Sequence, residues 1–145
     1  MNSIKTESAF GAVIFREEEG KRLYLLVKNV RGEWGFPKGH PDKTKDKGPK
    51  DTALREIYEE TNISKLEFIP GHKEELAYSY ERAGEETAKI SIYYLAKTEQ
   101  AEVKCNDNEH SELKWLPFKK AMELLSFPST KEILEKAEKR MTEGI

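Results

Sequence analysis

Arg55-Glu56-Ile57-Tyr58-Glu59-Glu60 is the stretch of this sequence that says most about its fold and chemistry. On a helix, Glu56 lies three residues before Glu59 and four before Glu60, so the three carboxylates share one face. Like charges at these spacings destabilise a helix by roughly 0.2–0.5 kcal/mol per pair, and Arg55 can offset part of that and orient Glu59. A cation that prefers hard oxygen ligands, Mg²⁺ or Mn²⁺, is a natural counter-charge. An ordinary exposed, Glu-rich helix face would give the same pattern.

The residues around this stretch predict a helix over Pro49–Thr61. Proline suits the first helical position, where its missing N–H goes unused. Asn62 follows the last helical residue and tolerates the left-handed conformation that often ends a helix. Ala53, Leu54 and Ile57 are predicted to form the apolar stripe that the helix buries.

Strands are predicted on both sides of this helix. The nearly continuous apolar runs Ala9–Phe15 and Leu23–Val27 predict a hairpin of strands covered on both faces. Trp34–His40 contains two glycines and a proline, which predicts an ordered loop. Further strands are expected at Leu66–Pro70, Glu75–Tyr80, Lys89–Ala96 and Leu113–Pro117, and helices at Phe118–Leu125 and Ser129–Met141. This order predicts a mixed α/β or α+β sandwich, and 145 residues fit one domain, 1–145.

Composition narrows the classes of partner. The net charge of −2 gives no general attraction to nucleic acid or anionic membranes. No apolar run approaches the ~20 residues that span a bilayer. The N-terminus lacks the basic and apolar regions of a signal peptide, and the one cysteine, Cys105, fits a reducing compartment. We therefore expect a cytoplasmic protein.

Lysines crowd the segment before the acidic helix. Placed beside that helix, they could hold a phosphate chain next to a metal ion, although charge alone favours a solvated loop and a solvated helix. They are Lys38, Lys43, Lys45, Lys47 and Lys50.

Gly39, the acidic helix and Ile63 together resemble the Nudix box, G-x5-E-x7-R-E-U-x-E-E-x-G-U, with U apolar. The second half of the pattern matches Arg55, Glu56, Ile57, Glu59, Glu60 and Ile63. In the first half, Gly39 precedes Arg55 by sixteen positions rather than fourteen, so the loop carries a two-residue insertion. The early Glu of the pattern falls on Lys47, and its late Gly falls on Asn62.

Resemblance to the Nudix family implies an αβα sandwich with a mixed central sheet and hydrolysis of a nucleoside diphosphate linked to another moiety. It also implies that Glu56 and Glu60 are the main ligands of Mg²⁺ or Mn²⁺. Glu59 would assist them as a ligand and in catalysis, and the Gly39 carbonyl would be a further ligand.

Other segments are similar to asymmetrically cleaving diadenosine tetraphosphate hydrolases, a branch of that family. Trp34–His40, WGFPKGH, looks like their W-x-x-P-K-G-H segment. Further likeness lies in Gly71–Tyr78, Lys89–Leu95, Glu109-His110 before Trp115-Leu116, and Ala121–Phe127. This resemblance implies that Lys38, His40 and Lys89 contact the polyphosphate. For His40, positioning water and a hydrogen-bonding role within the loop are alternatives.

The same resemblance places a nucleobase against Tyr78, with Phe127 as the opposite face and Tyr80 as an alternative. Aromatic stacking contributes roughly 1–3 kcal/mol per base, whereas simple packing is the other interpretation of these rings. The resemblance assigns the general base to Glu109, in the loop Asn106–Ser111, with Glu112 as the alternative.

These expectations combine into one hypothesis: metal-assisted attack of water on diadenosine tetraphosphate, releasing ATP and AMP. Other nucleoside diphosphate derivatives, an RNA 5′ end or a diphosphoinositol polyphosphate are alternative substrates. A nucleotide-binding module without turnover is an alternative from a different class, favoured by Lys47 and Asn62 and disfavoured by the intact carboxylates. A purely structural protein is disfavoured, because its clustered glutamates would destabilise their helix without return.

Overall fold

The computed structural model describes residues 5–106 and 110–144 of the chain. Its elements are β1 (Lys5–Glu18), β2 (Lys21–Asn29), β3 (Trp34–Gly35), β4 (Lys38–Gly39), α1 (Pro49–Thr61), β5 (Glu67–Arg82), β6 (Glu85–Lys97), β7 (His110–Pro117), α2 (Phe118–Leu124) and α3 (Pro128–Thr142).

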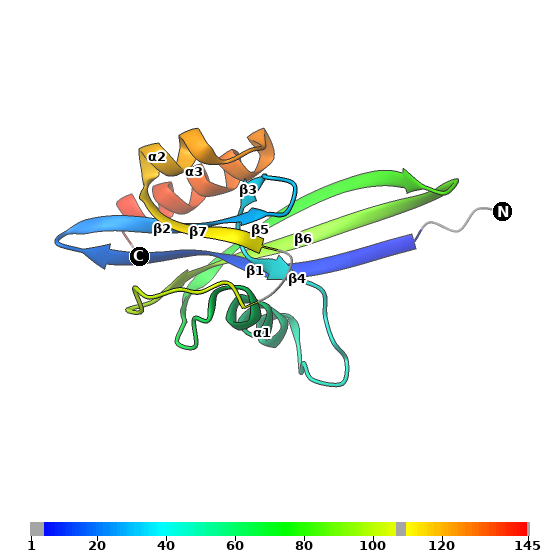
Figure 1. The fold of residues 1–145 in the computed structure, drawn as a ribbon, viewed down its shortest axis with the longest axis horizontal. Helices are drawn as coiled ribbons and strands as arrows, with labels where there is room; N and C mark the ends of the chain where they lie inside the picture. Colours follow the sequence, from blue (N-terminus) through cyan, green and yellow to red (C-terminus); the bar gives the residue numbers. More distant parts are fainter. Residues whose placement is uncertain (1–4, 107–109, 145) are drawn as a thin grey trace.

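The strands form one mixed sheet with β1 at its centre. β1 pairs with β6 in parallel and with β2 and β4 antiparallel, and β5 and β7 extend the sheet beyond β6 and β2. Helix α1 covers one face of the sheet, and α2 and α3 cover the other (Figure 1). The expected αβα sandwich with a mixed central sheet is therefore confirmed, as is the β1–β2 hairpin.

Alternation along β1 builds two cores. Val13 and Phe15 point into the cluster under α2 and α3, whereas Ala12 and Ile14 point into the cluster against α1. Successive side chains of a strand face opposite sides, so a sheet covered on both faces needs apolar residues at nearly every position. This explains why the strand segments are continuous apolar runs.

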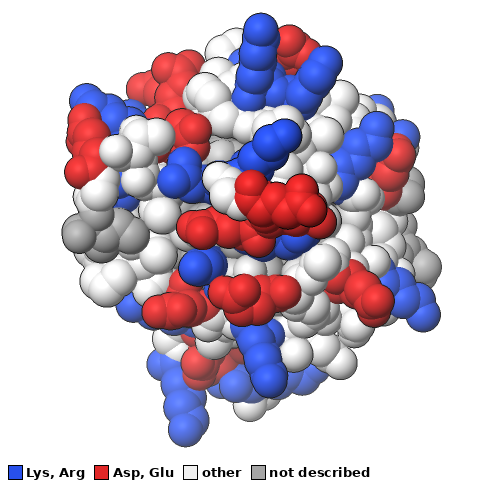
Figure 2. All heavy atoms as spheres, turned by 90° about the vertical axis from the view of Figure 1, so that its left-hand side faces the viewer, with Lys and Arg blue, Asp and Glu red and all other residues white. Residues whose placement is uncertain are grey.

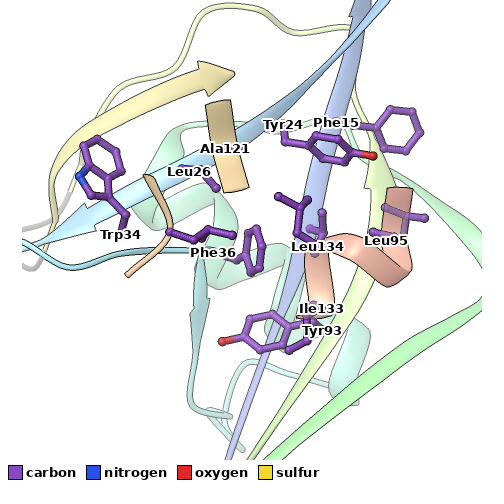
Figure 3. Close-up of a cluster of buried hydrophobic side chains, with 13 residues drawn as sticks. Phe15, Tyr24, Leu26, Trp34, Phe36, Tyr93, Leu95, Ala121, Ile133 and Leu134 are labelled. Atoms are coloured by element: carbon purple, nitrogen blue, oxygen red, sulfur yellow. The ribbon is translucent and has the colours of Figure 1, made fainter. Parts of the chain in front are cut away.

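The larger core lies between the sheet and α3 (Figure 3). Phe36 and Tyr93 meet edge to face, with ring centroids 5.7 Å apart. At the rim of this core, the Tyr24 hydroxyl donates to Glu138 at 2.7 Å, and Arg22 donates to the same carboxylate oxygen at 2.6 Å. These bonds tie α3 to β2.

Helix α1 has the predicted bounds, and Asn62 ends it in the left-handed conformation, at φ 65°. Ala53 and Ile57 are fully buried, but the prediction for Leu54 is wrong, because that side chain is 36% exposed. At 3.6 residues per turn, Leu54 is rotated by about 100° from Ala53 and leaves the buried face.

Two strand predictions also change. Trp34–His40 is not entirely loop, because it contains the short strands β3 and β4. The strands expected at Leu66–Pro70 and Glu75–Tyr80 are, apart from Leu66, parts of one strand, β5, whose pairing with β6 shifts register between Phe68 and Lys73. Pro70 has no N–H to donate to a ladder and Gly71 has a positive φ of 77°, so both suit this irregularity.

Charges of both signs are interspersed over the end of the molecule where β1 turns into β2. Figure 2 shows acidic side chains across the middle of this face and basic side chains around them. This mixed surface accords with the small net charge. Within the described residues, no helix has the length and apolar character needed to cross a membrane.

Candidate active site

A cleft of about 1190 Å³ brings most of the sequence-predicted site residues together. It exceeds the roughly 300–1,000 Å³ typical of ligand pockets. Helix α1, strands β4, β5 and β6, and the start of α3 contribute to its walls. The predicted residues that line it are Lys38, Gly39, His40, Glu56, Glu59, Glu60, Tyr78, Lys89 and Phe127.

The acidic wall of the cleft is packed directly against β4. A Cβ atom on residue 39 would lie 2.0 Å from the carboxyl carbon of Glu56, so the end of the Glu56 side chain occupies the space beside Gly39. Glu60 is 2% exposed, and its carboxylate accepts a hydrogen bond from the Lys38 backbone N–H at 3.2 Å. These contacts fix the position of β4 relative to the acidic face of α1.

Arg55 organises this wall from the helix. It donates to Glu56 at 2.9 Å and lies 3.3 Å from Glu59, as the i, i+4 spacing predicts. It also makes a two-point contact with Asp46, at 2.8 and 3.0 Å, which holds the pKa of that carboxyl well below its usual value. Asp46, one residue before the aligned Lys47, is thus the acidic residue of the loop that pairs with Arg55.

The lysines of the inserted loop do not line the cleft. Lys43, Lys45 and Lys47 are exposed, and the loop is shaped by backbone bonds from residues 45 and 46 to the Asp42 carbonyl. Lys50 lies near the Phe68 and Tyr94 rings. Of the five crowded lysines, Lys38 alone reaches the cleft wall.

Lys38 and Lys89 form the basic part of the cleft. Burial, together with the smaller effect of the neighbouring Lys89 charge, lowers the pKa of Lys38 to about 8. Two cations close together in a partly buried site favour an anionic ligand, because such a ligand relieves their repulsion.

His40 is held at the cleft edge by two contacts. Its Nδ1 lies 2.9 Å from the Ser8 carbonyl, and its own carbonyl accepts a bond from Arg55 at 2.8 Å. Because a carbonyl only accepts, Nδ1 carries a proton and donates it to Ser8, which leaves Nε2 for another partner. The structure thus shows that His40 forms hydrogen bonds within its surroundings at the loop, and His40 also lines the cleft.

The aromatic part of the cleft contains two exposed rings. Tyr78 is 46% exposed and Phe127 is 45% exposed, whereas Tyr93 beside them is buried. Two half-exposed aromatic side chains lining one cleft suit a flat ligand better than they suit core packing.

The structure describes one of the two candidates for the general base, Glu112. Glu109 lies outside the described residues. Glu112 is on β7 and forms ion pairs with Lys28 at 3.2 Å and Lys114 at 3.9 Å. It is not among the residues that line the cleft.

Comparison with known proteins places this geometry in a family. The model of the NUDIX domain matches residues 5–137 of the chain. The chain belongs to the Nudix family. The acidic helix, with Gly39 against Glu56, is the segment that resembles the Nudix box, and it lies within the matched residues of this enzyme, a member of a hydrolase family.

Relatives of this Nudix hydrolase include an asymmetrical bis(5′-nucleosyl)-tetraphosphatase from Caenorhabditis elegans, 30% identical over 88% of this chain and 91% of the relative. The crystal structure of a C. elegans Ap4A hydrolase binary complex superimposes with a TM-score of 0.80, covering 96% of this chain and 99% of that one at 30% identity. An RNA pyrophosphohydrolase from a Nitratiruptor species is 26% identical over 86% of this chain and 88% of its own length.

The donor set of the Nudix box fits a hard divalent cation. Three carboxylates and a backbone carbonyl lie on the cleft wall, and oxygen is the ligand that Mg²⁺ and Mn²⁺ prefer. Within residues 5–106 and 110–144, however, no group of three or more His, Cys, Asp or Glu side chains is close enough to hold a metal ion. Carboxylate oxygens of the box are instead engaged by Arg55 and by the Lys38 amide.

Three residues of the site were missed by sequence reasoning. Asp46 could have been found as the carboxylate nearest the position where the box expects a Glu. Tyr93 lies four residues after Lys89 on β6. Alternate residues of a strand share a face, so this spacing would have indicated that Tyr93 lies on the same face as Lys89. His110, whose Nδ1 lies 4.0 Å from Glu60, follows Glu109 directly but carried no signal of its own.

Proposed function

We propose that this Nudix hydrolase cleaves dinucleoside polyphosphates, with diadenosine tetraphosphate giving ATP and AMP. The observation that carries the proposal is that acidic, basic and half-exposed aromatic side chains line one cleft. A nucleotide needs all three: apolar surface for its base, cations for its phosphates and a reaction centre. The C. elegans tetraphosphatase supports the choice of substrate.

Tyr78 and Phe127 bind one nucleobase in this proposal. Stacking a base between them would contribute roughly 1–3 kcal/mol. A single gripped base fixes which phosphate lies at the acidic wall, and this accounts for unequal products from a symmetric substrate.

Lys38, Lys89 and His40 bind the phosphate chain. The chain's negative charge would raise the lowered pKa of Lys38 and keep that side chain protonated. The anchored His40 ring, with Nδ1 committed to Ser8, presents Nε2 to the phosphates or to water.

Glu56 and Glu60, with Glu59 and the Gly39 carbonyl, are the residues that would hold Mg²⁺ or Mn²⁺. When bound, such a cation neutralises charge on the phosphates and lowers the pKa of an attacking water. Arg55 hydrogen-bonds to Glu56 and is itself held by Asp46, and in this way the pair orients the carboxylates.

Glu109 orients or deprotonates the attacking water. Glu112 is the weaker candidate, because Lys28 and Lys114 already engage its carboxylate on β7. Loss of turnover in Glu109→Gln but not in Glu112→Gln would support this assignment.

The test is analysis of the products that purified protein forms from diadenosine tetraphosphate, with Mg²⁺ and with a chelator. ATP plus AMP, formed only with metal, is the expected result. Two ADP would overturn the asymmetric binding mode. Absence of turnover on this substrate would overturn the substrate choice. A panel of nucleoside diphosphate derivatives, diphosphoinositol polyphosphates and 5′-triphosphorylated RNA would then identify another activity.

A matched pair of variants tests the acidic wall. Glu60→Gln keeps the size of a buried side chain and removes its charge, whereas Glu135→Gln makes the same change on the exposed face of α3. We expect Glu60→Gln alone to lose metal-dependent turnover while its far-UV circular dichroism stays native. Unchanged hydrolysis by Glu60→Gln would refute the metal assignment. Nucleotide binding without turnover in any wild-type assay would favour a non-catalytic module.

A further inference from the structure

The outer halves of β5 and β6, with the start of β1, extend beyond the helices as a three-stranded arm (Figure 1). One face of this arm continues the wall of the cleft. Tyr78, which lines the cleft, pairs with Lys89 of β6, and Lys89 pairs with Glu7 of β1. Two residues further out, the next row is Tyr80, Thr87 and Lys5. Paired residues of neighbouring strands point to the same face, so both tyrosines lie on the cleft side.

The Tyr80 side chain reaches across this face. Its hydroxyl donates to the Glu7 carboxylate at 3.2 Å, although β6 runs between their two strands. Thr87, directly opposite Tyr80, is only 4% exposed, which accords with a ring that covers it. The hydrogen bond to Glu7 fixes the direction in which the ring points, and the Arg82 guanidinium lies over the ring.

The two tyrosine rings and an arginine form a continuous series from the cleft outwards. The ring centroids of Tyr78 and Tyr80 are 6.4 Å apart with an interplanar angle of 37°, and the Arg82 guanidinium carbon is 5.4 Å from the Tyr80 centroid. Aromatic residues side by side on a sheet face are a known platform for two or more bases, and arginine stacks on bases as well.

We propose that Tyr80 and Arg82 form a second nucleobase subsite, which binds the base at the far end of the substrate's phosphate chain. The proposal rests on the proposed function, with the first base at Tyr78. The substrate class is therefore a nucleotide that carries two bases, folded so that both lie on the arm.

The charges around the arm select this occupant. Glu81, Glu85 and Glu86 are exposed at its outer end, but only Glu85, which pairs with Arg82, shares the face of Tyr80. A phosphodiester strand that ran outwards from Tyr80 would pass the Glu85 carboxylate, which repels phosphate, whereas protein contacts to such strands depend on basic residues. A single uncharged base at the end of a returning chain does not place phosphate there.

Calorimetric binding of two non-hydrolysable, methylene-bridged ligands tests the subsite without relying on turnover. One is an analogue of diadenosine tetraphosphate and carries two bases; the other is an analogue of adenosine 5′-tetraphosphate and carries one. We expect wild-type protein to bind the two-base ligand roughly 5- to 100-fold more tightly. Tyr80→Leu should remove this difference and leave the one-base ligand unaffected. Tyr80→Phe, which keeps the ring, should preserve most of the difference.

Each other outcome overturns the proposal. Equal affinity of wild-type protein for both ligands, or of Tyr80→Leu and wild type for the two-base ligand, removes the second subsite. If Tyr80→Leu instead weakens only a 5′-triphosphorylated diadenylate, the platform serves an RNA end. Failure of the proposed function looks different: wild-type protein would not cleave diadenosine tetraphosphate, yet the calorimetric difference would remain.

Discussion

Gly11→Ala is a substitution whose effect follows from one close approach of two backbones. Gly11 of β1 pairs with Lys38 of β4, the strand that carries Lys38 and Gly39 to the cleft. A Cβ atom on residue 11 would lie 2.0 Å from the Pro37 carbonyl oxygen and 2.8 Å from the Lys38 Cα. Both of these atoms belong to backbone, so no side-chain rotation can relieve the contact.

The size of the effect can be worked out from that contact. Real Cβ atoms essentially never approach within 3.0 Å of another heavy atom, so the Pro37 oxygen must move by at least 3.0 − 2.0 = 1.0 Å. Overpacking of this kind destabilises by about 1–3 kcal/mol. For a chain near this size it lowers the melting temperature by roughly 2–12 °C. A displacement of 1 Å at a reaction centre reduces turnover by about 100-fold.

Gly35→Ala is the matched control for stability, because a Cβ atom there meets no atom within 4 Å. Differential scanning calorimetry of both variants should show a lowered melting temperature for Gly11→Ala and a change within about ±0.5 kcal/mol for Gly35→Ala. Turnover of Gly11→Ala is then measured well below its melting temperature. Equal stability of the two variants, with full turnover of Gly11→Ala, would refute direct backbone packing of β1 on β4.

Three further predictions concern groups around the site and core. Tyr24→Phe removes the hydroxyl that donates to Glu138 and should lower the free energy of unfolding by about 0.5–1.5 kcal/mol in urea titrations. Burial lowers the pKa of His72, so the folded chain favours the neutral ring and loses stability as pH falls below about 6.5. The melting temperature of His72→Gln should fall less than that of wild type as the pH is lowered from 7.5 to 5.5. Asp46→Asn should weaken Mn²⁺ binding about 10- to 100-fold in calorimetry, whereas Lys47→Gln should not.

Specific results would contradict each of these. Unchanged urea stability of Tyr24→Phe would mean that its hydroxyl bonds equally well to water. Parallel pH profiles for His72→Gln and wild type would show that the ring titrates normally. Equal Mn²⁺ affinity in the Asp46 and Lys47 variants would remove Asp46 from the support of the acidic wall.

Local patterns predicted α1 and the central strands well. The bounds of α1 follow from Pro49 and Asn62, whose backbone preferences act at the residue itself. The apolar runs of β1 and β2 likewise reflect burial on both faces. Leu54 was mispredicted because an apolar residue next to a buried one need not share its face.

Features that depend on distant pairing could not be predicted from local pattern. β3 and β4 are two residues each and exist because β2 and β1 offer them partners. Likewise, β5 stays one strand across Pro70 and Gly71 because β6 pairs with it on both sides. The role of Asp46 beside Arg55 depends on how the inserted loop folds, which residue spacing does not reveal.

Resemblance to the family predicted more of the site residues than the spacing of residues along the sequence did. Spacing alone grouped Glu56, Glu59 and Glu60, whereas Tyr78, Lys89 and Phe127 come from separate elements and were joined to them by family likeness. The structure lines one cleft with all six. Their roles stay predictions until the product and binding measurements are made.

The parallel pairing of β1 with β6 affects how the chain can fold during its synthesis. Lys5 pairs with Thr87, so 87 − 5 = 82 residues separate partners in the middle of the sheet. At roughly 5–20 residues per second, β1 leaves the ribosome some 4–16 seconds before its partner. In that interval the β1–β2 hairpin can form, but the apolar edge that awaits β6 stays uncovered. A nascent chain stalled before β6 should therefore be a preferred client of chaperones that bind exposed strands.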